Sequence, residues 1–463
     1  MLLWFYFQGY SHFNGGSMTR LIGIAILLGG IWGAISIEAQ SQDLHSITLD
    51  ESIERALDEH GMLESAQADA DEARAHQRRA QSGWWPSIRG QASYLRLSDN
   101  IPPIETDVPG VGETFSIAPI QQNQYHTEIA IEQLLFTGFR RSGERRAAAR
   151  RVEVADESLH QQRVDVALEV RRAYWSLAKA QQRREAADAA IEHVEAHLAD
   201  VRNRRTAGAA LESHVLAAKT RRSEVQLDRI EAENAVQSAR TELNQLIGEP
   251  RDRPLRLETE DVGGGEPLDP SLDELRTSAT DDHPRLNALR GHAAALDAEA
   301  GIARRQWMPT IALTGRYLFA RPNPYFFVER DAFRGSWEAG VTMRWTLWDG
   351  GRRSADADAA RARLRSAEAH LDHSERRIDQ SIERQHLAIE GARKAVEVAT
   401  QAVRQARASF EMAQEQFAEG AALSADVLEA ESALRSAEGR KAEAQANYAI
   451  AQGELLYALG RVW

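Results

Sequence analysis

The sequence predicts a mainly α-helical chain that carries a few amphipathic β-strands and is built from one unit present twice. The duplication is the first observation: the segment that begins at Leu49 returns at Leu272, an offset of 223 (272 − 49). Further along, Gly138 returns as Gly350, an offset of 212 (350 − 138). The other observations are two very long stretches without helix breakers and four segments that alternate apolar and polar residues. A repeat of this length indicates a fused pair of domains or half-domains.

The two offsets differ by 11 residues (223 − 212), and the change falls between Pro86 and Gly138. A gain or loss of residues in one place only marks a loop whose length is free to vary. The extra residues lie in Arg96–Gln124, whose counterpart Ala320–Ser336 is shorter. From these boundaries we divide the chain into an N-terminal extension (1–17), a signal peptide (18–39), a first repeat (40–248), a linker (249–271) and a second repeat (272–463).

The N-terminal part predicts a secretory signal peptide. Residues 21–37 are apolar, follow the basic start Met18–Arg20 and end in small residues, so we expect cleavage after Ser36 or Ala39. The alternative is an uncleaved anchor helix, but a run of about 17 residues is marginal for crossing a bilayer. Residues 1–17 fit no signal-peptide start and are not expected to belong to the natural protein. The mature chain is therefore expected to be exported.

Each repeat begins with two short helices and continues into strands. His60-Gly61 and His283-Pro284 break the helices at matching points, and Pro86 and Pro309 end the helical pattern so that a strand can follow. The predicted helices are 49–59, 62–82, 272–282 and 285–306. The predicted strands are 87–95, 125–136, 310–319 and 337–347.

The predicted strands have a period of two. In 337–347 the alternation is unbroken, whereas 310–319 has one lapse, Leu318, on its polar face. Aromatic residues near the strand ends and charges on the polar face match the wall of a transmembrane barrel, which has lipid on one side and water on the other. A half-buried sheet of a soluble domain uses the same alternation, and the strands alone favour that second interpretation.

After its second strand each repeat contains a helix of unusual length. Residues 139–205 contain no proline and only one glycine, Gly143, and residues 352–418 contain only Gly391. Such a helix is about 100 Å long at the standard rise per residue. Each ends at a glycine, as expected for a C-terminal cap. An extended coiled coil and the wall of a helical tube would both use this Ala-, Glu-, Arg-, Gln- and Leu-rich composition. The predicted returning helices are 211–247 and 425–459.

Composition excludes several classes of function. The net charge of −13 argues against nucleic acid as a partner, because phosphate binding needs a concentrated basic face. The chain has no cysteine, so disulfides, thiol catalysis and zinc–thiolate sites are excluded. His60 and His283 recur, but at helix breaks, and no cluster has the spacing of metal ligands. We therefore expect no enzyme, no metal and no cofactor.

Four strands cannot form a stable sheet in lipid by themselves. Each unpaired backbone group at an open edge costs several kcal/mol there, and single-chain barrels have at least about eight strands. If the strands lie in a membrane, copies of the chain must combine, and three copies would give 12 strands (3 × 4). The same homotrimer would gather 12 long helices (3 × 4) into a tube, and the product would be a conduit.

The chain resembles the TolC-like outer membrane efflux proteins over residues 47–463. Each matching motif is modest alone, but their order, duplication and spacing are specific. The motifs are Leu49–Ala56 (LDESIERA), Trp85–Ser87 (WPS), Leu347–Arg353 (LWDGGRR) and Phe417–Leu428 (FAEGAALSADVL). The resemblance implies a homotrimeric 12-stranded outer-membrane β-barrel, four strands per chain, that is continuous with a long periplasmic α-helical barrel.

The function implied by the resemblance is the outer-membrane channel of a tripartite efflux or type I secretion system. Such a channel lies in outer-membrane lipid, extends into the periplasm, and works with a periplasmic membrane-fusion adaptor and an inner-membrane transporter of RND, ABC or MFS type. The cargo stays open between drugs, metal ions and polypeptides, because the pump behind a passive conduit selects it. The alternative is an exported coiled-coil scaffold that does not enter a membrane.

In such proteins, acidic side chains six and nine positions after the second turn glycine ring the periplasmic constriction. These positions are Asp426 and Glu429 here (426 − 420 and 429 − 420), and three copies would form a cation-preferring ring. Alternatively, Asp426 only complements the dipole of a helix capped by Ser424. The family's closed-state latch positions hold Ala422 and His214, so any latch must use other pairs.

The resemblance also implies roles for the glycine-containing turns. Small, weakly polar turns between helices suit tip-to-tip docking of an adaptor hairpin, although compact turns without a partner would have the same composition. The predicted docking residues are Gly208, Ala209, Ala210, Leu211, Gly420, Ala421, Ala422 and Leu423. The predicted strand-to-helix junction residues are Gly138, Gly350 and Gly351.

Overall fold

The computed structural model describes residues 45–102, 104–107, 114–118, 121–258, 271–326 and 331–463. The predicted N-terminal extension and signal peptide, together with most of the predicted linker, lie outside these residues. The parts that are described form one compact unit.

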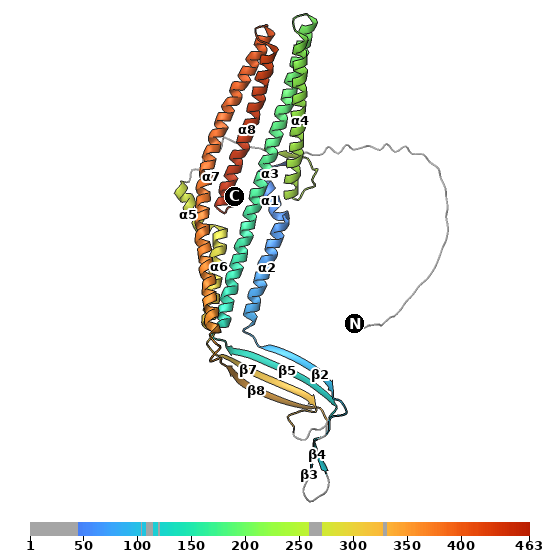
Figure 1. The fold of residues 1–463 in the computed structure, drawn as a ribbon, viewed down its shortest axis with the longest axis vertical. Coiled ribbons are helices and arrows are strands. Elements are labelled where there is room, and N and C mark those ends of the chain that lie inside the picture. The colour runs from blue at the N-terminus through green and yellow to red at the C-terminus, as the bar shows by residue number, and fades with distance from the viewer. Residues whose placement is uncertain (1–44, 103, 108–113, 119–120, 259–270, 327–330) are drawn as a thin grey trace, which may run out of the picture. The chain divides into compact units, whose positions relative to one another are not determined.

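The duplication predicted from the sequence is visible as the same series of elements in both halves (Figure 1). The first half contains α1 (Leu49–Glu59), α2 (Gly61–Ser82), β2 (Ser87–Arg96), β5 (Asn123–Phe136), α3 (Arg140–Thr206) and α4 (Glu212–Leu246). The second half contains α5 (Leu272–Asp282), α6 (Pro284–Arg304), β7 (Thr310–Arg321), β8 (Arg334–Arg344), α7 (Arg352–Ala418) and α8 (Ser424–Ala458). Both α3 and α7 have 67 residues, and both α4 and α8 have 35, which is why the second sequence offset stays constant.

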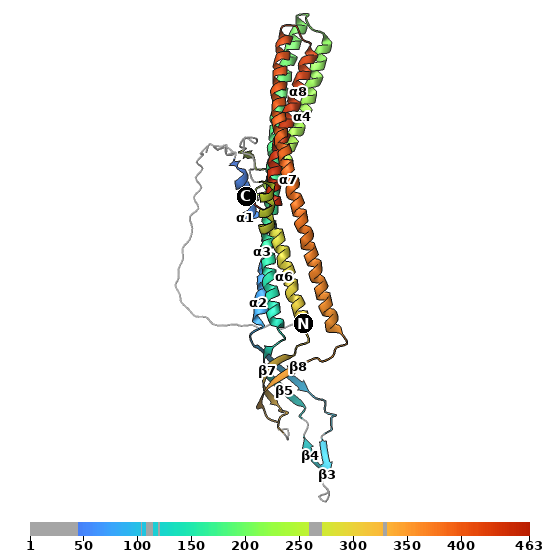
Figure 2. The same ribbon diagram turned by 90° about the vertical axis from the view of Figure 1, so that its left-hand side faces the viewer.

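The strands form one four-stranded antiparallel sheet in the order β2-β5-β7-β8. The prediction for 337–347 was wrong at both ends, since β8 starts three residues earlier and ends at Arg344. Its partner β7 begins only after Pro309, and the register pairs Thr310 with Arg344, so residues further along β8 meet no partner strand. In Figures 1 and 2 the sheet lies at one end of the long helices.

The register separates an apolar face from a polar face across the whole sheet. Directly paired residues in an antiparallel ladder point to the same side. One row therefore joins Gly90, Ile129, Tyr317 and Trp337 on the apolar face. The adjacent row joins Arg89, Ala130, Arg316 and Glu338 on the polar face, where Arg316 forms an ion pair with Glu338 and Arg89 with Glu132.

Two short pairs of strands were not predicted. Within the longer inter-strand loop, β3 (Ile104–Asp107) and β4 (Thr114–Ala118) form an antiparallel hairpin. Within the predicted linker, β6 (Leu255–Leu257) pairs in parallel with β1 (His45–Ile47). Strands of three to five residues give too short an alternation to be recognised from sequence.

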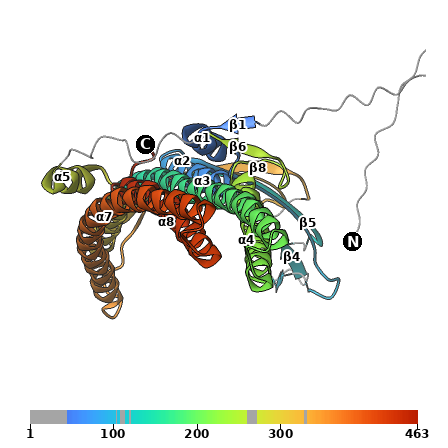
Figure 3. The ribbon, with the colours of Figure 1, turned by 90° about the horizontal axis from the view of Figure 1, so that it is seen from above.

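Contacts join α7 to α8, α8 to α3 and α3 to α4, and seen along the helices these four follow an arc (Figure 3). A cluster of buried residues around α3, which includes Tyr174, Leu177 and Leu243, holds α1, α4 and β1 together. The hydroxyl of Tyr174 lies within hydrogen-bond distance of the backbone oxygens of Ile47 (3.2 Å) and Glu258 (2.9 Å), and its single proton is shared between them. Polar backbone groups inside this core are therefore satisfied, as buried groups must be.

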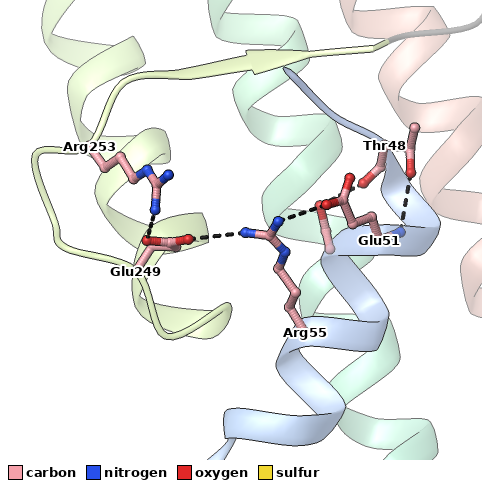
Figure 4. Close-up of polar contacts among 6 residues, drawn as sticks. Thr48, Glu51, Arg55, Glu249 and Arg253 are labelled. Atoms are coloured by element: carbon pink, nitrogen blue, oxygen red, sulfur yellow. Dashed lines mark hydrogen bonds and ion pairs between the residues drawn. The ribbon is translucent and has the colours of Figure 1, made fainter. Parts of the chain in front are cut away.

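The LDESIERA motif forms an ionic clasp between α1 and the end of α4 (Figure 4). Thr48 caps α1 by accepting a hydrogen bond from the backbone N–H of Glu51 (3.2 Å). Arg55 donates hydrogen bonds to Glu51 (2.7 Å) and to Glu249 (3.0 Å). Glu249 also accepts a hydrogen bond from Arg253. The motif is therefore structural, because it attaches the first helix to the residues that follow the returning helix.

The recurring histidines serve as helix caps. Nδ1 of His60 accepts from the backbone N–H of Met62 (3.4 Å), and Nδ1 of His283 accepts from that of Arg285 (3.2 Å). Burial, assisted by the nearby Arg285 and His160, lowers the pKa of His283 to about 4, so its ring stays neutral and able to accept. Among the described residues, no group of acidic or histidine side chains could hold a metal ion, and no helix has the length and apolarity needed to cross a membrane.

Candidate functional site

Both glycine-containing turns lie at the end of the long helices that is remote from the sheet (Figures 1 and 2). Gly208 (φ 76°) and Gly420 (φ 78°) adopt the left-handed conformation that ends a helix. After Gly208, the N–H of Ala209 donates to the backbone oxygen of Arg204 (2.8 Å), and after Gly420 the N–H of Ala421 donates to that of Gln416 (2.7 Å). The two turns are therefore built alike, as the repeat predicted.

Apart from Glu419, the side chains of the two turns are small or apolar. Leu211 and Leu423 occupy matching positions just before the returning helices and are 67% and 65% exposed. Ala209 and Ala421 are exposed beside them, whereas Ala210 and Ala422 are half-buried.

Asp426 lies in the first turn of α8 and is exposed to solvent. Its carboxylate accepts a hydrogen bond from the backbone N–H of Leu423 (2.7 Å), so it satisfies one of the free donors at the helix start. The N-cap residue is Leu423, so the alternative of a helix capped by Ser424 was wrong in its cap residue. Glu429 is exposed about one turn further along the same helix.

Ser424 instead joins the two helical hairpins. Its hydroxyl lies 2.8 Å from Nε2 of His197 on α3, and both side chains are buried. Burial lowers the pKa of His197, with Asp200 offsetting part of this effect, so the ring is neutral at this contact. Beside it, Arg204 donates to the backbone oxygen of Ala418 (3.0 Å).

A further connection between the hairpins is a buried ion pair that was not predicted. Nε and Nη2 of Arg221 on α4 lie 3.1 and 2.9 Å from one carboxylate oxygen of Glu431 on α8. The Glu431 side chain is 2% exposed and that of Arg221 is 14% exposed. Burial lowers the pKa of Arg221, but the hydrogen bonds to Glu431 and Glu224 outweigh it and raise the pKa overall, so the guanidinium is charged. Further along the same helices, Arg435 pairs with Asp228 (2.8 Å).

The sequence did carry a signal for this pair. Glu431 lies between Val427 and Leu434 in the apolar stripe of α8, and Arg221 lies between Ala218 and Val225 in that of α4. A charge at a core position requires a buried partner. The positions of the family's latch, Ala422 and His214, do not belong to this ion pair. Glu212, which is near His214, pairs with Arg205 across its own turn (2.6 Å).

The predicted strand-to-helix junction contains three glycines in the left-handed conformation: Gly138 (φ 61°), Gly350 (φ 70°) and Gly351 (φ 90°). Gly138 also lies in a crowded position, because a Cβ there would approach Cβ of Met308 to 2.9 Å. Asp349 accepts from the N–H of Gly351 (3.2 Å) and pairs with Arg353 (2.7 Å), which holds the start of α7.

Comparisons with known proteins agree with this geometry. A model of the family described as outer membrane efflux protein matches residues 52–249 and 275–461. Protein CyaE of Bordetella pertussis is 30% identical over 239 residues, which cover 50% of this chain and 49% of that protein. The chain therefore spans about half the length of this curated relative.

Solved structures share the fold over most of the chain. The outer membrane protein VceC from Vibrio cholerae superposes with a TM-score of 0.71 at 20% identity, covering 89% of this chain and 96% of that one. A membrane protein from Pseudomonas aeruginosa superposes with a TM-score of 0.74 at 20% identity, covering 89% and 93%.

Proposed function

Because the chain belongs to the outer membrane efflux protein family, we propose that it is the outer-membrane channel of a tripartite efflux or type I secretion system, a passive conduit without catalytic activity. The observation that carries this proposal is a four-stranded sheet with one apolar and one polar face at the end of an arc of long helices. Such an arc and such a sheet are what one third of a closed tube would contribute.

The sheet has the surface expected of a barrel wall in lipid. Exposed aromatic side chains gather at both ends of its strands, as in the girdles that mark the two membrane interfaces of outer-membrane barrels. Those near the helices are Trp85, Trp307, Trp345 and Trp348, and those near the loops are Tyr94, Tyr125, Phe319 and Trp337. Because β2 and β8 are the outer strands of the sheet, three copies that pair β8 of one with β2 of the next would close a 12-stranded barrel (3 × 4).

The helices at the two ends of the arc carry exposed apolar residues at corresponding heights. Ile230 on α4 lies 19 residues after Leu211 (230 − 211), about 28 Å from the turn. Val398 on α7 lies 21 residues before Glu419 (419 − 398), about 31 Å from its turn. A neighbouring copy that brings α7 against α4 would cover both side chains. The exposed apolar residues are Leu216, Leu227 and Ile230 on α4, and Leu387, Val398 and Met412 on α7.

Cysteine cross-linking should detect this seam, because the chain has no cysteine of its own. We expect Ile230→Cys with Val398→Cys to give a covalent trimer on mild oxidation, seen by non-reducing electrophoresis. The matched control combines Ile230→Cys with Met412→Cys, which lies only about 10 Å from its turn. That pair should stay uncrosslinked, since disulfides need Cβ atoms within about 4.5 Å. Equal cross-linking of both pairs would contradict the proposed seam.

At the turns, three copies would bring six carboxylates of Asp426 and Glu429 around the axis. Both side chains are exposed on α8, and Asp426 is additionally held by the N–H of Leu423. This is the support for a cation-preferring gate. The exposed leucines Leu211 and Leu423 support docking of a periplasmic adaptor at the same end, with an inner-membrane transporter behind it.

Planar-bilayer recording tests the channel and the gate together. Purified protein should conduct, and Asp426→Ala with Glu429→Ala should weaken block by divalent cations because the carboxylate ring is removed. Glu419→Ala, in the exposed turn itself, is the control and should leave block unchanged. Unaltered block in the double variant would remove these residues from the gate, whereas no conductance under any condition would favour an exported scaffold.

A further inference from the structure

The second half of the sheet carries apolar residues on its polar face. Leu318, the one lapse in the alternation of β7, pairs with Ser336, and Ala320 pairs with Arg334. Leu318 is 4% exposed and Ala320 is 1% exposed. By contrast, Gln91 and Ser93, which face the same side on β2, are exposed. Something therefore covers the polar face on β7 and β8 that does not cover it on β2.

The cover is the segment that follows β7, residues 322–326, which we call the strap. The Asn323 side chain is buried and donates to the backbone oxygen of Arg334 (2.9 Å) and to Oγ of Ser336 (3.0 Å). Its oxygen accepts from the N–H of Tyr325 (3.0 Å). Because Ser336 points to the polar face with Leu318, these bonds place the strap on that face.

Two aromatic side chains of the strap continue along the polar face. The Tyr325 hydroxyl donates to Glu338 (2.6 Å) and accepts from Arg316 (3.2 Å), so it joins the ion pair between these residues. The ring of Phe326 lies 4.7 Å from the guanidinium of Arg334. Tyr325 and Phe326 nevertheless remain exposed on their outer sides. They lie over the polar face, and their exposed sides border the space next to it.

The corresponding segment of the first half does not return over the sheet in this way. There the strands end at Arg96 and Asn123, the N–H of Leu97 donates to the backbone oxygen of Gln122 (2.7 Å), and the chain continues into the β3–β4 hairpin. Among the described residues the strap is thus a feature of the second half, and a trimer would carry three.

We propose that the strap is a fixed aromatic rim inside the conduit, near the end opposite the helices, and that it limits the size of what passes there. The inference rests on the proposed function, because only a closed barrel turns the polar face into a lumen. Three copies of Tyr325 and Phe326 would place six rings around that lumen, each set anchored by Asn323. Narrowing by side chains that line a pore is a direct means of selection.

Thiol labelling from outside whole cells tests the rim. Ser87→Cys places a single cysteine on the polar face at the end of β2 nearest the helices, beyond the strap for a reagent that enters from the loop end. Maleimides of increasing size are then applied. We expect small reagents to label this cysteine equally with and without Tyr325→Ala and Phe326→Ala, and large reagents to label it severalfold faster when both rings are removed.

Matched variants separate the rim from other effects. Tyr317→Ala removes a tyrosine from the apolar face of the same strand and should not change the size limit, while Tyr325→Phe keeps the ring but loses its bonds to Glu338 and Arg316. Assembly of each variant is checked by electrophoresis of the trimer. If large reagents label the cysteine equally with and without the two rings, the proposed size limit is wrong, whereas the proposed conduit is not affected. Failure of the smallest reagent to label Ser87→Cys in any variant would overturn the conduit, and the rim with it.

Discussion

In the proposed channel, replacing Glu431 by alanine should open the end of the helical tube and raise the conductance. The substitution leaves the guanidinium of Arg221, whose side chain is 14% exposed, without its main partner. Removing one member of a buried ion pair costs up to about 3–5 kcal/mol, and Arg221 would keep Glu224 (3.1 Å), which lies on its own helix and is 56% exposed. The least costly response is for α4 and α8 to separate so that water reaches Arg221. Planar-bilayer recording of the variant beside the unmodified protein measures the effect.

Two controls make this prediction specific. Arg222, the neighbour of Arg221, pairs with Glu195 (2.9 Å), but their side chains are 42% and 48% exposed and both lie on one hairpin. Arg222→Ala should therefore cost at most about 1 kcal/mol and leave conductance unchanged. Replacing both members of the buried pair by apolar residues, Arg221→Met with Glu431→Leu, should restore the conductance of the unmodified protein, since neither charge is then left unpaired. If the double variant conducts more than the unmodified protein, or if Glu431→Ala does not, the ion pair of Arg221 with Glu431 does not hold the two hairpins together.

Gly143→Ala should destabilise the folded chain, whereas Gly391→Ala should stabilise it. These are the single glycines of α3 and α7. A Cβ at Gly143 would clash with Cγ1 of Ile302 on α6. A Cβ at Gly391 would have no neighbouring atom within 4 Å. Overpacking a helix contact costs about 1–3 kcal/mol, and alanine in an exposed helix gains about 1 kcal/mol over glycine. Thermal unfolding of both variants should therefore shift in opposite directions.

A rescue variant tests the cause. Ile302→Ala removes the atoms that a Cβ at position 143 would meet, so Gly143→Ala combined with it should lose less stability than the sum of the single variants. Strict additivity would mean that the two residues do not interact, and the explanation by close helix packing would be wrong.

The helical part of the fold was predictable almost to the residue. The bounds predicted for 352–418 coincide with α7, and those for 49–59 and 272–282 coincide with α1 and α5. Helix formation depends on local propensity, on the absence of Gly and Pro, and on caps within a few residues, all of which the sequence displays. The equal lengths of α3 and α7 were likewise visible as a constant offset.

The candidate site was predictable only in part. Asp426 lies in the first turn of α8 and the two glycines end the long helices, as the sequence analysis expected, but the roles proposed for these residues remain predictions. The contact of Ser424 with His197 was missed, and so was the ion pair of Arg221 with Glu431, which are 210 residues apart. Such pairs depend on which helices become neighbours, and no local pattern encodes that.

The sequence by itself determined the duplication, the long helices, the glycines of the turns and the alternation of the strands, because each depends on residues close together in the chain. Only the tertiary structure decided the sheet order, the ends of β8, the pairing of β1 with β6 and the buried ion pair between the hairpins. It also explained Leu318, an apparent error in an alternating strand that becomes a covered position once the strap returns over it. These features arise from contacts between distant segments, whose partners are fixed by packing and by the cost of leaving buried charges unpaired.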